Sequence, residues 1–249
     1  MRGDADALRI HFVAVGPREL SRVCGPLISL RADRAFLLRA GVDREAPYRE
    51  KIREVLKTAK VEVLELDVEM SDPALLANSV VKIVESSPGM NYRFNLSTGP
   101  REAALGGYLV SMFWNVQPYW SLVAHDLPPE DSEFDDHPFS HTVNVPAFRQ
   151  VPPRPELLDA LDWLVDEAKP ARQKVMIEAL VDRGIIRPKV EGKATHLSAQ
   201  AKQGQFRSII EALQRFNFVR QESPSNPRVW SPTDQAKVAL ALFRGRRQT

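Results

Sequence analysis

The stretch with the clearest chemical character is residues 95–101 (NLSTGPR), which lie between an apolar run and a predicted helix. Ser97, Thr98 and Gly99 are small, so a ligand can approach the backbone closely here. The helix that follows presents unpaired N–H groups and a partial positive charge at its N-terminus, and Arg101 adds a full charge. These residue types at this spacing predict a phosphate-binding loop. The alternative is a capped helix start in which Asn95 only holds a turn.

A second turn of similar character ends the first predicted strand, where Gly16, Pro17 and Arg18 follow an apolar run. Neither turn is a Walker A loop, because no Gly-Lys-Ser/Thr closes it, and the G-x-G-x-x-G spacing of dinucleotide-binding loops is absent. The two turns together give one set of candidate ligand-binding residues: Gly16, Pro17, Arg18, Asn95, Ser97, Thr98, Gly99, Pro100 and Arg101.

The elements that must position these turns alternate between strand and helix. The strand segments share short apolar runs and cover residues 9–15, 35–38, 61–66, 92–96 and 119–123. Apolar residues at spacings of three and four predict helices between them. Repeated strand–helix–strand units favour a parallel sheet covered on both faces, with ligands beyond the carboxyl ends of its strands. We therefore expect an α/β fold, a Rossmann-like parallel sheet, with both turns at its ligand-binding edge.

Two further elements of this half carry specific expectations. The helix after residues 95–101 is expected to bury one apolar face: Leu105, Leu109, Met112 and Val116. Gly106 and Gly107 within it are interpreted as close packing of helix on sheet. A strand over residues 142–147 is expected to be antiparallel or at an edge, because Pro146 cannot donate to a sheet ladder.

The composition is that of a soluble globular protein: 249 residues, 43% hydrophobic and 27% charged. No run approaches the roughly 18 apolar residues that a membrane span needs. The first residues carry no apolar signal segment. Cys24 is the only cysteine, which excludes an internal disulfide and a cysteine-rich zinc finger and fits a reducing compartment. We expect a cytoplasmic protein with no membrane partner.

The formal net charge of +2 conceals a split along the chain. Residues 1–153 hold 17 Lys+Arg against 21 Asp+Glu, whereas residues 154–249 hold 17 against 11. The proline-rich residues 152–155 form a stiff linker between the two regions. We therefore expect domains over residues 1–150 and 154–249, and the asymmetry indicates two roles, one of them nucleic-acid binding.

An acidic segment precedes this linker. Residues 126–136 hold six acidic residues and no basic one, which is typical of a solvated loop. His137 and His141 beside it are four residues apart, a spacing that would suit a metal ion, but Pro138 and the loop context argue against one. We expect no metal site.

The second half has the order of a winged helix-turn-helix: three helices followed by a two-stranded hairpin. The first two helices share apolar faces, which are Leu157, Leu158, Leu161 and Leu164, and then Val175, Ile177, Leu180 and Val181. The third helix begins at Ser198 and turns Phe206, Ile209, Ile210 and Leu213 inward. The hairpin covers residues 216–221 and 228–230.

The third helix and hairpin present the side chains that contact DNA bases and phosphates in such domains. The candidate DNA-binding residues are Lys202, Gln205, Arg207, Ser208, Arg215 and Arg228. Residues 171–249 hold 15 basic against 6 acidic residues, so counterion release would favour binding to duplex DNA. The alternative is a winged helix used for protein contacts or for dimer support.

The two halves together resemble the archaeal regulators that join an N-terminal CARF domain (CRISPR-associated Rossmann fold) to a C-terminal winged helix-turn-helix. The most specific match is the Asn-x-Ser/Thr-x-Gly-x-Arg pattern of residues 95–101; residues 16–18 and the LRADR segment at residues 30–34 also match. Three departures are Pro100, the polar residues 187–196, and a wing at residues 223–228 without a Gly-Arg turn.

The resemblance implies a homodimer in which the ligand loops of both copies form one pocket for a cyclic oligoadenylate effector, with no other cofactor. We expect a ligand-responsive transcriptional regulator that is not an enzyme. A first alternative is a ring nuclease, in which Ser97, Thr98 and Arg101 would align the ribose 2′-hydroxyl and stabilise charge. No histidine follows the Arg-x4-His spacing of CARF-linked ribonucleases. The second alternative is a non-catalytic interaction protein.

Overall fold

The computed structural model describes residues 7–16, 19–41, 47–124, 137–166, 170–187, 198–223 and 228–243. The acidic segment at residues 126–136 lies outside the described residues, as does nearly all of the polar stretch at residues 187–196. The chain divides into two compact units, Met1–Val151 and Pro152–Thr249. Within the described residues, the first unit holds a six-stranded sheet and the second a three-stranded sheet. The expected Rossmann-like domain is confirmed by the six-stranded sheet, and the elements of the second unit follow the order expected of a winged helix.

The sheet of the first unit has the strand order β3-β2-β1-β4-β5-β6. Its strands are β1 Arg9–Ala14, β2 Arg34–Arg39, β3 Glu62–Asp67, β4 Asn91–Asn95, β5 Val116–Val123 and β6 Phe139–Asn144. The first five are parallel, whereas β6 pairs antiparallel with β5 at the edge. Its expected antiparallel direction and its place at the sheet edge are confirmed, although it covers residues 139–144 instead of 142–147. It ends before Pro146, which has no N–H to offer a ladder.

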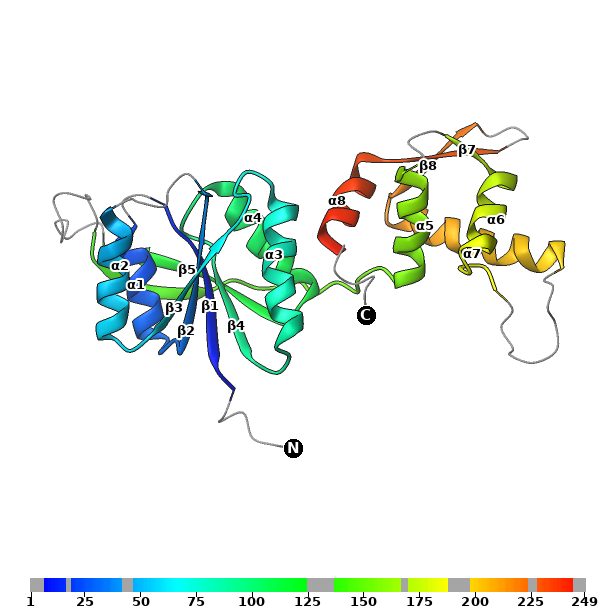
Figure 1. The fold of residues 1–249 in the computed structure, drawn as a ribbon. Coiled ribbons are helices and arrows are strands. Elements are labelled where there is room, and N and C mark those ends of the chain that lie inside the picture. Colours follow the sequence, from blue (N-terminus) through cyan, green and yellow to red (C-terminus); the bar gives the residue numbers. More distant parts are fainter. Residues whose placement is uncertain are drawn as a thin grey trace. The chain divides into compact units, whose positions relative to one another are not determined.

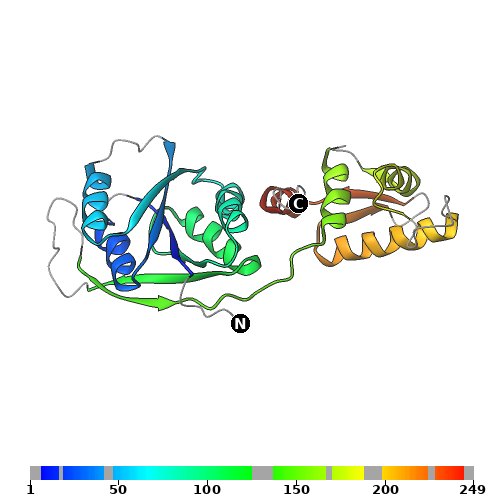
Figure 2. The ribbon, with the colours of Figure 1, turned by 60° about the horizontal axis from the view of Figure 1, so that its bottom comes forward.

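Two pairs of helices cover the sheet (Figures 1 and 2). One face carries α1 Leu20–Ser29 and α2 Pro47–Thr58, and the other carries α3 Pro73–Ser86 and α4 Arg101–Phe113. Each parallel connection passes through a helix, so both faces are buried. The start of α3 is fixed by Asp72, whose carboxylate accepts from the N–H groups of Ala74 and Leu75 at 2.8 and 3.1 Å.

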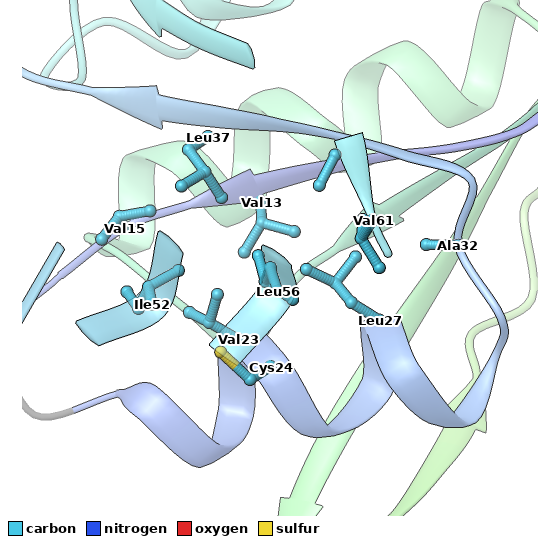
Figure 3. Close-up of a cluster of buried hydrophobic side chains, with 11 residues drawn as sticks. Val13, Val15, Val23, Cys24, Leu27, Ala32, Leu37, Ile52, Leu56 and Val61 are labelled. Carbon is cyan, nitrogen blue, oxygen red and sulfur yellow. The ribbon is translucent and has the colours of Figure 1, made fainter. Parts of the chain in front are cut away.

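The core under α1 and α2 is formed by alternate strand residues and one face of each helix (Figure 3). Val13 and Leu37 project from neighbouring strands onto Leu27 of α1 and Leu56 of α2, and all four are at most 1% exposed. Cys24 lies in the same cluster and is buried.

The face that α4 buries differs from the expected one. Leu105 is 53% exposed, and Val116 belongs to β5 instead of to the helix. The buried positions of α4 are smaller and lie on another side of the helix: Ala103, Gly106, Gly107, Val110 and Ser111. The most hydrophobic side chains therefore do not mark the packed face, because this helix approaches its neighbours too closely to admit them.

The expected close packing of helix on sheet is confirmed at Gly107, whereas Gly106 packs against the neighbouring helix α3. A Cβ atom on Gly107 would lie 2.3 Å from the ring of Phe94 in β4. A Cβ atom on Gly106 would lie 2.8 Å from the carbonyl oxygen of Pro73 in α3. The helix that starts at the candidate ligand loop is thus held against both the sheet and its partner helix.

We predict that Gly107→Ala destabilises the protein by about 1–3 kcal/mol, because the new methyl group overlaps a rigid ring. Gly204→Ala in the second unit is the matched control, since nothing lies within 4 Å of its added Cβ atom. That change should stabilise by about 0.5–1 kcal/mol through helix propensity. Denaturant unfolding followed by circular dichroism measures both, and equal effects of the two changes would contradict the packing argument.

The second unit is a winged helix in its order of elements. They are α5 Pro155–Asp166, β7 Ala171–Arg172, α6 Gln173–Asp182, α7 Ala199–Arg215, β8 Val219–Ser223, β9 Val229–Pro232 and α8 Asp234–Phe243. The strands pair in the order β7-β9-β8. The short β7 is absent from the sequence prediction, because two residues carry no periodicity of their own.

The core of this unit follows the expected faces with one exception. Helix α5 buries all four predicted leucines, and α7 buries Phe206, Ile210 and Leu213. Ser198 caps α7, and its hydroxyl accepts from the N–H of Ala201 at 3.1 Å. In α6, however, Val175 is 50% exposed, and the buried positions are Met176 and Leu180, four residues apart.

No helix in the described part of the chain has both the length and the apolar character to cross a membrane.

Candidate functional site

The strand order places the two predicted ligand loops side by side. The chain runs outward from β1 to β2 and β3 on one side and from β4 to β5 on the other, so the order reverses between β1 and β4. Ligands in open α/β sheets bind at such a switch point, outside the carboxyl ends of the strands. Gly16 follows β1 and residues 95–101 follow β4, so both loops reach this position. Pro17 and Arg18 lie outside the described residues.

Asn95 is completely buried beneath the loop at residues 95–101 and fixes its shape. Its side-chain oxygen accepts from the N–H of Ser97 at 3.0 Å and from the hydroxyl of Ser97 at 2.6 Å. The same serine oxygen accepts from the N–H of Ser121 in β5 at 2.7 Å. Asn95 and Ser97 therefore lock the turn to the sheet, and Asn95 has no exposed surface to offer a ligand.

The amide group of Asn95 has a second partner that explains why it is needed. Its nitrogen donates to the carbonyl oxygen of Arg22 in α1 at 2.8 Å, and the hydroxyl of Ser121 donates to the same oxygen at 3.0 Å. In a regular helix this carbonyl would accept from the N–H of residue 26, but Pro26 has none. The β4 and β5 side chains replace the missing donor and tie α1 to the loop.

We predict that Asn95→Ala destabilises the first unit by about 1–3 kcal/mol, because buried polar groups lose their partners. Pro26→Ala restores a helical donor to the Arg22 carbonyl. In that background Asn95→Ala should cost less, with a coupling of at least about 0.5 kcal/mol in a double-mutant cycle. The cycle is measured by denaturant unfolding, and strictly additive effects would show that the two residues do not share this carbonyl.

A carboxylate that the sequence prediction missed joins the two loops. One oxygen of Glu19 accepts from the N–H of Gly16 at 2.9 Å and from the N–H of Gly99 at 2.8 Å. Gly99 has a φ of 75°, in the left-handed region, and a Cβ atom there would lie 2.6 Å from that of Ala14. The only sequence signal was an acidic residue three positions after Gly16. Amides from both loops thus donate to a single anionic group, and that group is a side chain of the protein itself.

We predict that Glu19→Ala creates a binding site for a small anion at these amides. Sulfate should raise the melting temperature of this variant more than that of the wild type, compared at equal ionic strength in chloride. Glu19→Gln is the control and should respond like the wild type, because its amide oxygen still accepts both bonds. An equal response of all three proteins would mean that the amides do not form an anion site.

Two cavities flank the turn at Gly99 and Pro100. The larger, about 510 Å³, is lined by Arg22, Ser97, Arg101 and Trp120, among other residues. The smaller, about 350 Å³, contains Glu19 and the apolar side chains of Val15, Ala40 and Met70. Arg22 was missed by the sequence prediction, yet it faces the same cavity as the predicted Arg101. Neither arginine forms an ion pair with another described residue, so this cavity is the cationic one.

The remaining predicted residues of the loop differ in access. Pro100 and Arg101 are exposed at the start of α4, where no described side chain caps the helix. Thr98 is 1% exposed, and its hydroxyl has no hydrogen-bond partner in the described structure. Ligand contact is therefore open to Ser97, Gly99, Pro100 and Arg101, whereas Asn95 and Thr98 lie beneath the surface.

His11 is a buried titratable group of this unit and lies outside the two ligand loops. Burial, together with the positive charges of Arg93 and Arg9, lowers the pKa of His11 to about 3. The imidazole is therefore neutral at pH 7, with Nδ1 3.2 Å from the hydroxyl of Tyr119. No group of three or more His, Cys, Asp or Glu residues suited to a metal ion occurs in the described part of the chain.

In the second unit, the predicted DNA-binding residues separate into three groups. Lys202, Arg207 and Arg228 line two adjoining hollows beside α7, although Arg207 also pairs with Glu211 at 2.7 Å. Gln205 is already engaged: its side-chain amide bonds both the N–H and the carbonyl of Arg187, at 3.2 and 2.9 Å.

Ser208 and Arg215 are exposed elsewhere on α7. The structure adds Arg172 and Lys174, which the sequence prediction did not include, to the wall of the first hollow. Both residues lie where β7 meets α6, and the sequence analysis did not predict β7 because it has only two residues.

Comparison with known proteins gives a partial match. The family model described as "HFX_2341_N:-like, N-terminal" matches residues 9–123, which run from the first residue of β1 to the last of β5. No curated protein matches the chain.

Solved structures resemble it at low sequence identity. Can2 from Sulfobacillus thermosulfidooxidans, in complex with cyclic tetra-adenylate, is 12% identical with a TM-score of 0.41, over 95% of this chain and 64% of that one. Protein VC1899 from Vibrio cholerae is 17% identical with a TM-score of 0.39, over 94% and 64%. The present chain thus spans 64% of the length of each. These likenesses are too distant to carry a function from either protein to this chain.

Proposed function

We propose that the protein is a ligand-responsive regulator of transcription. The first unit would bind a cyclic oligoadenylate at the switch point, and the second would bind duplex DNA. The observation that carries the proposal is the pairing of a cationic cavity at the β1/β4 edge with a basic winged helix in one chain.

The ligand assignment rests on the charges around Gly99. The amides of Gly16 and Gly99 already hold the carboxylate of Glu19, so a ligand phosphate would lie in the other cavity, beside Arg22 and Arg101. A phosphodiester carries one negative charge per linkage and suits such a pair. The loop pattern shared with CARF regulators narrows the phosphodiester to a cyclic oligoadenylate.

The regulatory assignment requires that ligand and DNA affect one another. A second copy of the chain would bring its own loop to the ligand, and binding would then change the spacing of the two α7 helices. Such coupling exists only where the ligand favours one dimer geometry over the other. We propose a homodimer for this reason and because the similar CARF regulators are dimeric.

The ligand site is tested by calorimetry with cyclic tetra-adenylate. We expect wild-type binding, and about tenfold weaker binding by Arg101→Ala, because a charged hydrogen bond to phosphate is lost. Lys82→Ala, an exposed cation on α3, removes the same charge away from the site and should leave the affinity unchanged. Absence of wild-type binding, or equal loss in both variants, would contradict the site.

The DNA role is tested by fluorescence anisotropy with labelled duplexes. Affinity should fall linearly with salt on a log–log scale, because each phosphate contact releases counterions. Adding cyclic tetra-adenylate should shift the dissociation constant if the two units are coupled. A protein that binds no duplex at low salt would instead be the interaction protein of the second alternative.

The ring-nuclease alternative is tested with the same ligand. We expect cyclic tetra-adenylate to be recovered intact by chromatography after prolonged incubation with the protein. Appearance of linear products, reduced in Arg101→Ala, would assign cleavage to the cavity instead.

A further inference from the structure

One side of helix α7 borders a continuous groove in the second unit. A hollow of about 810 Å³ lies between the β7–α6 corner and the first turns of α7. A second hollow, about 590 Å³, lies between α7 and the β8–β9 hairpin. Gln173, Gln203 and Arg228 line both hollows. The two therefore form one groove, the α7 groove, that runs from α6 past Arg228 to the hairpin.

The charges of the α7 groove are mainly positive and unpaired. Arg172, Lys174, Lys202 and Arg228 line it, and none forms an ion pair with another described residue. Two other exposed cations of this unit are paired, Arg220 with Glu222 at 2.8 Å and Lys237 with Asp234 at 3.4 Å. Glu178 and Asp182 are the acidic residues of the first hollow. Cations left unpaired along one concave surface indicate a polyanionic partner.

A buried donor lies in the wall of the second hollow. Trp230 is 4% exposed, and its indole N–H has no hydrogen-bond partner in the described structure. A buried N–H group without an acceptor is rare, because it loses its bond to water and gains none in exchange. Four glutamines with several rotatable bonds line the same hollow: Gln173, Gln203, Gln214 and Gln221. A phosphate oxygen in the groove would supply the acceptor.

The exposed face of α7 offers fewer unpaired polar and charged side chains to DNA than the groove does. The side chain of Gln205 is held by the backbone of Arg187. Ser208 and Arg215 line neither hollow and present one cation between them. The groove beside the helix therefore carries more unpaired positive charge than the most exposed face of the helix.

We propose that the α7 groove binds the sugar–phosphate backbone of duplex DNA, with Arg172, Lys174, Lys202 and Arg228 as its cationic contacts. The proposal rests on the DNA-binding function and adds the path of the backbone and two contacts, Arg172 and Lys174, from outside the third helix. The contacts read no bases, so they set affinity and position instead of sequence preference.

The test compares two variants that remove the same charge. Arg172→Gln/Lys174→Gln removes two cations from the groove, and Arg183→Gln/Lys237→Gln removes two exposed cations that line neither hollow. Duplex binding is measured by anisotropy across a range of salt concentrations. The groove variant should bind about tenfold or more weakly at low salt, with a log–log salt slope reduced by about 2. The control should keep the wild-type slope.

Trp230→Phe gives an independent readout. It keeps an aromatic ring in the core and removes only the N–H, so we expect about tenfold weaker binding with an unchanged salt slope. Thermal melting checks that the variant is folded. A folded Trp230→Phe with wild-type affinity would remove the tryptophan from the binding surface.

The outcomes separate the two levels of the proposal. If the wild type binds duplex and the two double variants weaken binding equally, the groove assignment is wrong and the DNA function stands. If the wild type binds no duplex at low salt, both the groove assignment and the DNA-binding function are wrong. Inorganic phosphate is added at the ionic strength of a chloride control; competition beyond that control would assign the groove to small anions instead of a DNA backbone.

Discussion

The architecture of the ligand loops depends on a hydrogen bond that helix α1 cannot make for itself. Pro26 removes the donor that the Arg22 carbonyl would have within the helix. Asn95 and Ser121 supply the donors instead. Because Asn95 also accepts from Ser97, one buried side chain fixes both the position of α1 against the sheet and the shape of the turn after β4. The same arrangement sets the backbone of Arg22 beside the loop, so its side chain reaches the cavity of Arg101.

Glu19 extends this constraint to the loop after β1. Its carboxylate binds one amide from each loop, so the loops after β1 and β4 act as one unit. The carboxylate occupies these amides, so the positively charged part of the proposed ligand site is the cavity of Arg22 and Arg101. The site thus has a negatively charged region and a positively charged region on either side of Gly99. This division follows from Glu19, the residue just before α1.

The sequence predicts the features that depend on local chemistry. The strands, the turn at Gly99, the close approach at Gly106 and Gly107, and the caps of α3 and α7 each follow from residue type and spacing. Features that depend on the order of the strands in the sheet cannot be predicted from residue type and spacing. No local pattern tells that β1 and β4 are neighbours, and therefore that Glu19 can reach Gly99, 80 positions along the chain.

The face of α4 was mispredicted for a related reason. Hydrophobicity favoured Leu105, but the helix packs too closely for leucine and buries glycine and alanine. Periodicity identifies an apolar stripe only where side chains of ordinary size fill the interface. The role of Gln205 was likewise invisible, because its partner is the backbone of Arg187 on another element.

Several cations of the sheet in the first unit are held in ion pairs. In the first unit, Arg9 bonds Asp33 at 2.8 Å and holds the pKa of that carboxyl at about 2, while Arg34 pairs with Glu62 and Arg39 with Asp67 along the outer strands. Exposed pairs of this kind stabilise little, but they leave no charge over for a ligand.

Cations without such partners line two concave surfaces in the described part of the chain. Arg22 and Arg101 lie beside the switch point, and Arg172, Lys174, Lys202 and Arg228 lie in the α7 groove. The near-neutral total of +2 is therefore compatible with two anion-binding surfaces. Net charge sums over paired and unpaired groups alike, whereas the attraction for a phosphate depends on the unpaired ones and on the concave surfaces that collect them.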